Sequence, residues 1–179
     1  MFGFIYIGSC WNKLQYGSYP SGRRCAVVGT LGLAALVSGC ASNLSKADEE
    51  LRIQQSVLRY QFGHNAAANK YHIFCVAISE GETESDAPKE LIRDLNDVSH
   101  KVVKHSDCNA HIDNGATERS SGKPALMLNV GKVNWVAKDE AVVEGGYYEN
   151  GLSSSGNIYH LKKISGVWHV VQNHMNWIS

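Results

Sequence analysis

The C-terminal third of the chain, residues 125–178, carries an alternating pattern that strongly restricts the fold. Apolar side chains stand at every second position through Leu126, Leu128 and Val130, and the phase then moves by one residue at Gly131. A period of two is typical of strands with one buried face, and a phase change at glycine predicts a β-bulge that bends the strand. We therefore expect four successive antiparallel strands, in residues 125–137, 141–148, 157–164 and 167–178.

The dipeptide Ser165-Gly166 predicts a two-residue turn between the last two of these strands. Such a turn fixes the register, because side chains alternate strictly between the two faces of a sheet. We expect the face that carries Trp168 to be buried in the core. The residues expected to share this face are Tyr159, Leu161 and Val170. His160 and His169 are then expected on the opposite face.

The preceding part of the domain is expected to hold two helices and two strands. Ser45-x-x-Asp48 is close to a capping box and predicts a helix that ends at Gly63. Asp86 as N-cap and Pro88 in the first turn predict a second helix. The expected strands are residues 71–78 and 101–106. The expected loops are an acidic turn at residues 80–85, a long loop at 109–124 and a Gly/Ser loop at 150–156.

Together these elements predict an α+β fold, in which two helices pack on a curved antiparallel sheet that ends in a four-strand meander. The order helix, strand, helix and long bent sheet resembles that of NTF2-like and cystatin-like domains. The final strand, with Gly166-x-Trp168-x-Val170 at its start, is similar to the ending of many small exported members. The resemblance covers residues 45–179 and implies one cone-shaped domain. It transfers no functional residue, because that fold hosts enzymes, binding proteins and structural modules.

The first 39 residues have the composition of a secretory signal peptide. Arg23 and Arg24 precede an apolar run at residues 25–37, and the small residues Ser38 and Gly39 follow it. A run of about 13 residues is shorter than the roughly 20 that a membrane-spanning helix needs. We therefore expect residues 1–39 to be a signal peptide with an N-terminal extension, which leaves a single domain of ordinary size at residues 45–179.

The tetrapeptide Val37-Ser38-Gly39-Cys40 resembles the lipobox of bacterial lipoproteins. The resemblance implies cleavage before Cys40, attachment of diacylglycerol to its thiol, and a lipidated tether at residues 40–44. It also implies a lipid anchor in the cell envelope. Ala41, rather than aspartate, after the cysteine implies the outer membrane, with the domain facing the periplasm. The alternative is a signal peptide or a buried hairpin helix in which the cysteine is incidental.

Two cysteines, Cys75 and Cys108, remain in the domain once Cys40 and the leader are set apart. Paired cysteines are common in exported domains because the compartment is oxidising. We therefore expect a disulfide between them. The alternative is two separate buried thiols.

The charge balance argues against nucleic acid as a partner. The whole chain has 17 Lys+Arg and 17 Asp+Glu, and residues 1–39 hold three of the basic residues and no acidic one, so the remaining chain has a net charge of −3. Binding to nucleic acid depends largely on Lys and Arg side chains that neutralise phosphates. The sequence likewise predicts no basic patch that would assist a lipid anchor.

The sequence predicts no catalytic residue, no metal site and no cofactor. His160 and His169 are expected to lie diagonally across the last hairpin, but the spacing fixes no third ligand, and a catalytic zinc normally has three. There is no Gly-x-Ser-x-Gly motif, and the acidic turn lacks the alternating ligands of a calcium loop.

Four residues remain as candidates for contact with a partner. Tyr147 and Tyr148 follow a pair of glycines, which permit close approach by another backbone, and tyrosines are common interface anchors. The alternative is a bulge with one tyrosine in the core and one outside. His160 and His169 complete the set.

Two functions from different classes fit these observations. The first is a non-enzymatic envelope lipoprotein that binds another protein or a component of the cell envelope. The second is an NTF2-like pocket for a small ligand, or an enzyme built on such a pocket. An exposed aromatic patch over a filled core favours the first, and buried polar residues that converge on a cavity favour the second.

Overall fold

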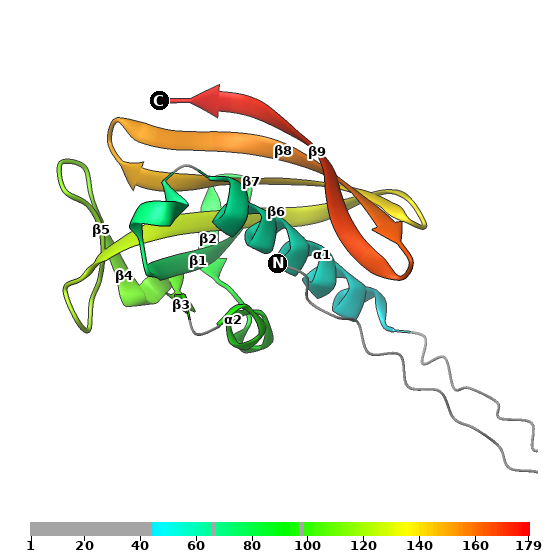
Figure 1. Cartoon of the computed structure of the whole chain (residues 1–179), viewed down its shortest axis with the longest axis horizontal. Helices are drawn as coiled ribbons and strands as arrows, with labels where there is room; N and C mark the ends of the chain where they lie inside the picture. Colours follow the sequence, from blue (N-terminus) through cyan, green and yellow to red (C-terminus); the bar gives the residue numbers. More distant parts are fainter. Residues whose placement is uncertain (1–43, 66, 97–98) are drawn as a thin grey trace, which may run out of the picture. The chain divides into compact units, whose positions relative to one another are not determined.

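The computed structural model describes residues 44–65, 67–96 and 99–179 (Figure 1). These residues form an α+β fold in which two helices, α1 (Lys46–His64) and α2 (Lys89–Leu95), pack on a mostly antiparallel mixed sheet. The expected leader and Cys40 lie outside the described residues. Within the described ranges, no helix is both long and apolar enough to cross a membrane.

Nine strands are described, together with two short 3-10 helices. The strands are β1 (Ile73–Glu80), β2 (Thr83–Asp86), β3 (Lys101–Lys104), β4 (Cys108–His111), β5 (Gly115–Glu118), β6 (Pro124–Ala137), β7 (Glu140–Asn150), β8 (Ser153–Ile164) and β9 (Val167–Ile178). The 3-10 helices are η1 (Ala68–Lys70) and η2 (His105–Asp107). The main strand order is β2-β1-β6-β7-β8-β9, and each neighbouring pair from β6 to β9 is antiparallel.

The sequence predicts a purely antiparallel sheet, but the observed sheet is mixed. Strand β1 runs parallel to both β3 and β6. Parallel neighbours need a long crossover connection, and β2 with α2 supply it between β1 and β3. The prediction of an antiparallel sheet was therefore wrong at β1.

Three segments that were expected to be loops contain strands. The acidic turn is a tight β1–β2 hairpin around Gly81, whose φ is +63°. The long loop at residues 109–124 holds most of β4 and all of β5, and β8 already begins at Ser153. The side chains of β2 and the last three of β4 are exposed, so these strands lack the apolar alternation that marks a half-buried strand. Helix α2 also begins later than expected, because its N-cap is Pro88 while Asp86 ends β2.

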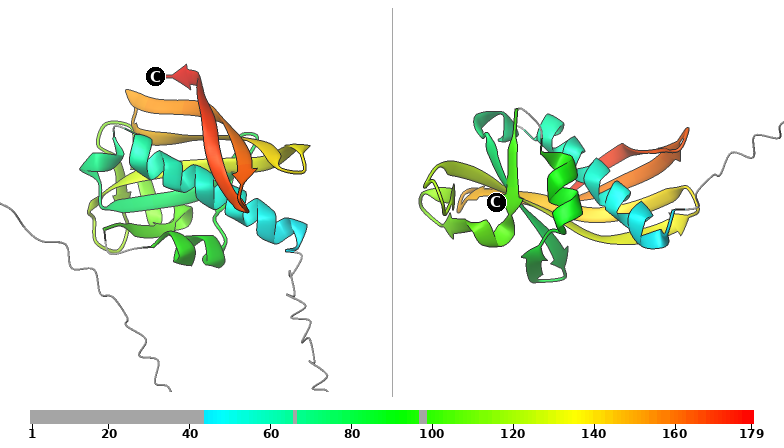
Figure 2. Two further views of the ribbon diagram at one scale, coloured as in Figure 1. Left: turned by 45° about the vertical axis from the view of Figure 1, so that its right-hand side comes forward. Right: turned by 90° about the horizontal axis from the view of Figure 1, so that it is seen from below.

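Helix α1 begins at the predicted capping box. The Ser45 hydroxyl accepts a hydrogen bond from the Asp48 backbone N–H at 3.2 Å, and the Asp48 carboxylate accepts one from the Ser45 N–H at 3.3 Å. The helix continues one residue beyond Gly63 and lies along one face of the sheet, with the start of β9 beside it (Figures 1 and 2). Its core-facing residues are Ile53, Gln54, Val57, Leu58 and Gln61.

Two indole groups connect the first turn of α1 to the sheet. Trp168 Nε1 donates to Glu49 at 2.7 Å, and Trp135 Nε1 donates to Glu50 at 3.0 Å. Lys163 Nζ also donates to Glu49, at 2.6 Å, and this bond and the Trp168 indole keep the pKa of Glu49 below its usual range. The acidic first turn of α1 therefore pairs with specific donors as well as with the helix dipole.

The predicted turn between the last two strands is confirmed. Ser165 and Gly166 both have positive φ, 51° and 83°, as a type I′ turn requires, and Ile164 pairs with Val167. Trp168 is buried on the core face, together with Tyr159 and Leu161. The predicted bulge after Gly131 is also present, as a register shift between β6 and β7.

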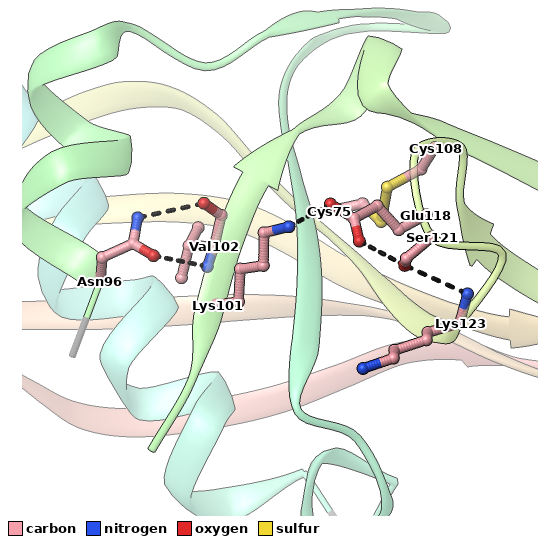
Figure 3. A network of polar contacts seen from close by, with 8 residues as sticks. All are labelled: Cys75, Asn96, Lys101, Val102, Cys108, Glu118, Ser121 and Lys123. Carbon is pink, nitrogen blue, oxygen red and sulfur yellow. Dashed lines mark hydrogen bonds and ion pairs between the residues drawn. A yellow bond between two sulfur atoms is a disulfide. The ribbon is translucent and has the colours of Figure 1, made fainter. Parts of the chain in front are cut away.

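The Cys75–Cys108 disulfide is present and joins β1 to β4, with a Cα–Cα distance of 6.3 Å (Figure 3). Close to it, Lys101 Nζ donates to the buried carboxylate of Glu118, which also accepts a hydrogen bond from Ser121 at 2.6 Å. The hydrogen bond from Lys101, followed by that from Ser121, lowers the pKa of Glu118 to about 2. This end of the sheet is therefore held by a covalent bond and an ion pair side by side.

Candidate functional site

The two faces of the sheet differ in what covers them. One face packs against α1 through residues such as Leu128, Val130 and Val143, and we call it the helix-covered face. Residues at alternate positions point to the opposite face, which we call the outer face. Because antiparallel partners share a face, the pairings place Asn129 and Trp177 on the outer face, in one row across β6 to β9.

Between these two residues, the row consists of glycines. Asn129 pairs with Gly146, Gly146 with Gly156, and Gly156 with Trp177. A Cβ atom on Gly156 would lie 2.2 Å from Nε1 of the Trp177 indole, so the ring rests directly on the glycine backbone. Trp177 is nevertheless 52% exposed. One side of the Trp177 ring therefore packs against the Gly156 backbone, while much of the residue stays accessible to solvent on the outer face.

Trp177 lies at the junction of two adjoining cavities of about 240 and 360 Å³, which share Glu84, Asn129 and Ser155 as well as the indole. We call this combined hollow the Trp177 groove. The other residues that line it include Glu82, Ala110, Met127, Glu144, Gly146, Tyr148, Ser154, Gly156, Asn157 and Asn176. Its wall on the β2 side is formed by Glu84 and His105.

The groove has an acidic character. The Glu84 carboxylate accepts a hydrogen bond from Asn129 Nδ2 at 2.8 Å and lies 3.5 Å from His105 Nδ1. Glu82 and Glu144 add two further carboxylates, whereas His105 is the only basic side chain among the described residues that line the groove. The described residues that line the groove include no Lys or Arg. An exposed indole beside three carboxylates is suited to a cationic group, which both can attract.

The predicted pair Tyr147 and Tyr148 is divided between the two faces. Tyr148 lines the Trp177 groove, and its hydroxyl donates to the His111 carbonyl at 3.2 Å. Tyr147 packs against the core on the helix-covered face, as strand alternation dictates. One tyrosine of the pair therefore faces the core and the other faces outward, as the alternative to a binding role predicts. A role of either tyrosine in binding stays a prediction.

The two candidate histidines lie away from the groove. His160 pairs with Gln172 and is half-buried, while His169 pairs with Lys162 and is exposed. Neither residue lines the two cavities around Trp177. In the part of the chain that the structure describes, no group of three His, Cys, Asp or Glu residues is placed to hold a metal ion.

Sequence reasoning missed Trp177 and Gly156 as site residues. Two bulges in the β8–β9 pairing, at His160/Leu161 and at Gly156/Asn157, separate Trp177 from the turn that fixes the register. The available signal was a tryptophan in the last strand together with a glycine near the start of the preceding strand. Only the long-range pairing shows that the two residues are in contact.

Comparison with known proteins gives one similar structure. No family model matches this chain, and no curated protein matches it. A solved NTF2-like protein of unknown function from Shewanella baltica is 14% identical, with a TM-score of 0.38, and the match covers 75% of this chain and 99% of that one. The neighbour carries the family name that the sequence suggested, but at this TM-score the likeness carries no argument about this chain.

Proposed function

We propose that the protein is a non-enzymatic, lipid-anchored protein of the bacterial cell envelope, which binds another envelope protein in the Trp177 groove. The lipobox-like sequence ending at Cys40 supports the anchor and an outer-membrane location facing the periplasm. The observation that carries the binding function is the half-exposed indole of Trp177, which rests on Gly156 within an acidic groove. The preferred partner is an extended segment with basic side chains.

The chemistry of the groove supports this type of partner. Tryptophan is enriched among residues that dominate binding energy, and its ring attracts Lys and Arg side chains. Gly156 allows the Trp177 indole to lie directly on the strand backbone, since a side chain at this position would collide with the ring. Glu82, Glu84 and Glu144 would pair with basic groups on either side of the indole.

Replacement of Trp177 by alanine is expected to weaken partner binding about 30-fold, the effect of losing a hot-spot residue worth about 2 kcal/mol. The partner is first captured from membranes with the wild-type protein, and its Kd is then measured with purified variants. Gly156→Ala should cause a similar loss, because the added methyl group displaces the indole. Val171→Ala is the matched control, as Val171 is exposed on the same strand and lies outside the groove.

The same measurement has a clear opposing outcome. Equal Kd values for wild type, Trp177→Ala and Gly156→Ala would mean that the partner does not occupy the groove. A Kd that does not rise with salt concentration would argue against a basic partner, because exposed charge pairs are screened by salt.

The anchor is tested separately through Cys40. Cys40→Ser is expected to move the protein from the membrane fraction to the soluble fraction, because no acyl chain can then be attached. Fractionation by density gradient should place the wild-type protein with outer-membrane markers. Intact-mass spectrometry provides the decisive comparison: an exported wild-type protein with an unmodified Cys40 would contradict the proposed anchor.

A further inference from the structure

Strand β9 ends the main strand order, so one of its two edges has no neighbouring strand among the described residues (Figure 1). A free edge presents unpaired backbone groups, and natural sheets protect it with charged residues, proline, bulges or a short strand. The strand Val167–Ile178 contains no Asp, Glu, Lys, Arg or Pro. It has only two bulges, and the later one comes before Trp177. Residues 172–178, which follow the first bulge, are all exposed, and we call them the β9 edge.

Strands β2 and β3, which pair only with β1, provide a comparison. Each has four residues, whereas β9 has twelve. Strand β2 carries Glu84 and Asp86, and β3 begins with Lys101 and ends with Lys104. Both strands therefore have the short length and the charges that oppose pairing with another chain. The same sheet leaves β9 long and uncharged.

The hydrogen bonds at the two ends of β9 show which part of this strand is open. At the start, the Trp168 carbonyl accepts a hydrogen bond from Ser56 Oγ of α1 at 3.1 Å, so the helix covers this part. At the end, Ser154 and Ser179 exchange two backbone hydrogen bonds, of 3.0 and 3.4 Å. Antiparallel pairs alternate between residues that exchange hydrogen bonds and residues that do not. Ile178 therefore directs its backbone N–H and C=O away from β8, towards the free edge.

The two faces of the β9 edge differ in chemical character. Trp177 lies on the outer face, at the acidic Trp177 groove. Ile178 and Met175 lie on the helix-covered face, because their rows across the sheet contain Tyr147 and Val130, which pack in the core. These two side chains are 64% and 54% exposed. A strand added to this edge would meet an acidic aromatic surface on one face and exposed apolar side chains on the other.

We propose that the β9 edge binds an extended segment of the partner as an additional β-strand, whose side chains are alternately basic and apolar. This inference rests on the proposed function and adds its mode of binding. Because strand side chains alternate between faces, the basic ones would lie beside Trp177 and the apolar ones beside Met175 and Ile178. In such strand addition, main-chain hydrogen bonds give affinity and alternate side chains give specificity.

The test uses the octapeptide acetyl-(Lys-Val)4-amide as the probe, because its alternation matches the two faces of the edge. Its binding to the purified Cys40→Ser protein, which needs no detergent, is measured by calorimetry. We expect saturable binding of one peptide per chain. A control octapeptide with the repeat Lys-Lys-Val-Val has the same composition but mixes both residue types on each face. It should bind about tenfold more weakly.

Backbone N-methylation of the octapeptide tests the main-chain hydrogen bonds. In an extended peptide, the N–H groups of all lysines point to one edge and those of all valines point to the other. Methylation of one set should abolish binding, whereas methylation of the other set should change the Kd less than about twofold, because those groups face solvent. Equal effects of the two methylations would overturn the added strand.

A substitution in the protein tests the same bonds from the other side. Ile178→Pro removes an N–H group that faces the free edge and should weaken binding about tenfold, as expected for the loss of one hydrogen bond. Ile178→Val is the matched control, because it keeps the N–H group and an apolar side chain. Its Kd should change less than about twofold.

Trp177→Ala separates this inference from the proposed function. Octapeptide binding that depends on Trp177 but tolerates Ile178→Pro would overturn the added strand and leave the groove as the site. Binding that depends on Ile178 but tolerates Trp177→Ala would support the added strand and count against the indole as the anchor. An octapeptide that shows no saturable binding overturns the alternating strand, whereas the proposed function is decided by the captured partner.

Discussion

Replacement of Trp168 by alanine is expected to lower the free energy of unfolding by about 3–5 kcal/mol, the usual cost of truncating a large buried aromatic residue. Trp168 is 4% exposed and packs edge-on against Trp135, with ring centroids 5.6 Å apart. Its indole N–H also donates to Glu49 on α1. The substitution therefore leaves a cavity and removes one of the two hydrogen bonds that join Glu49 to the last hairpin. Urea denaturation monitored by circular dichroism measures the change.

His169→Ala is the matched control, because His169 is the next residue of the same strand and faces solvent. Its substitution is expected to change the free energy of unfolding by no more than about 0.5 kcal/mol, and His160→Ala should behave similarly. A destabilisation by His169→Ala as large as that of Trp168→Ala would show that the two faces of β9 are assigned the wrong way round. Loss of partner binding with stability retained would instead show that the histidines belong to a binding site.

Removal of the Cys75–Cys108 disulfide by the double substitution Cys75→Ala/Cys108→Ala is expected to cost about 2–5 kcal/mol. The bridge closes a segment with a sequence separation of 33, so it restricts the unfolded chain substantially. Both sulfur atoms are also buried, against Ile73 and Ala125, and the truncation leaves unfilled space there. A domain with a total stability of about 5–15 kcal/mol would lose much of it.

Two measurements check this expectation. Denaturation of the double variant is compared with that of the wild-type protein in the presence and absence of reductant, and reductant should destabilise only the wild type. Thiol labelling of the denatured, unreduced exported protein should modify neither cysteine. Two free thiols per exported molecule, or equal stability of variant and wild type, would contradict a stabilising disulfide.

The features that the sequence determined are those set by a few adjacent residues. The capping box at Ser45 satisfies backbone groups within one helical turn, so its effect is readable without the rest of the chain. The Ser165-Gly166 turn and the phase change at Gly131 act equally locally, through backbone conformation and the two-residue period of a strand. The disulfide was predictable as well, because the two cysteines of the domain, Cys75 and Cys108, allow a single intramolecular pairing.

Only the tertiary structure decided which distant segments meet. Strand β1 pairs in parallel with β6, and no local pattern specifies the partner or the direction of a buried strand. The exposed strand β2 and the mostly exposed β4 form because neighbouring strands satisfy their backbone groups, while their side chains keep the composition of a loop. Their hydrogen bonds outweigh their weak strand propensity.

The Trp177 groove belongs to this second category for the same reason. Two bulges in the β8–β9 pairing act together to place Trp177 over Gly156, and each bulge reverses the face to which the following side chains point. Local conformation follows from neighbouring residues, whereas a groove arises only when strands distant in sequence take their final register.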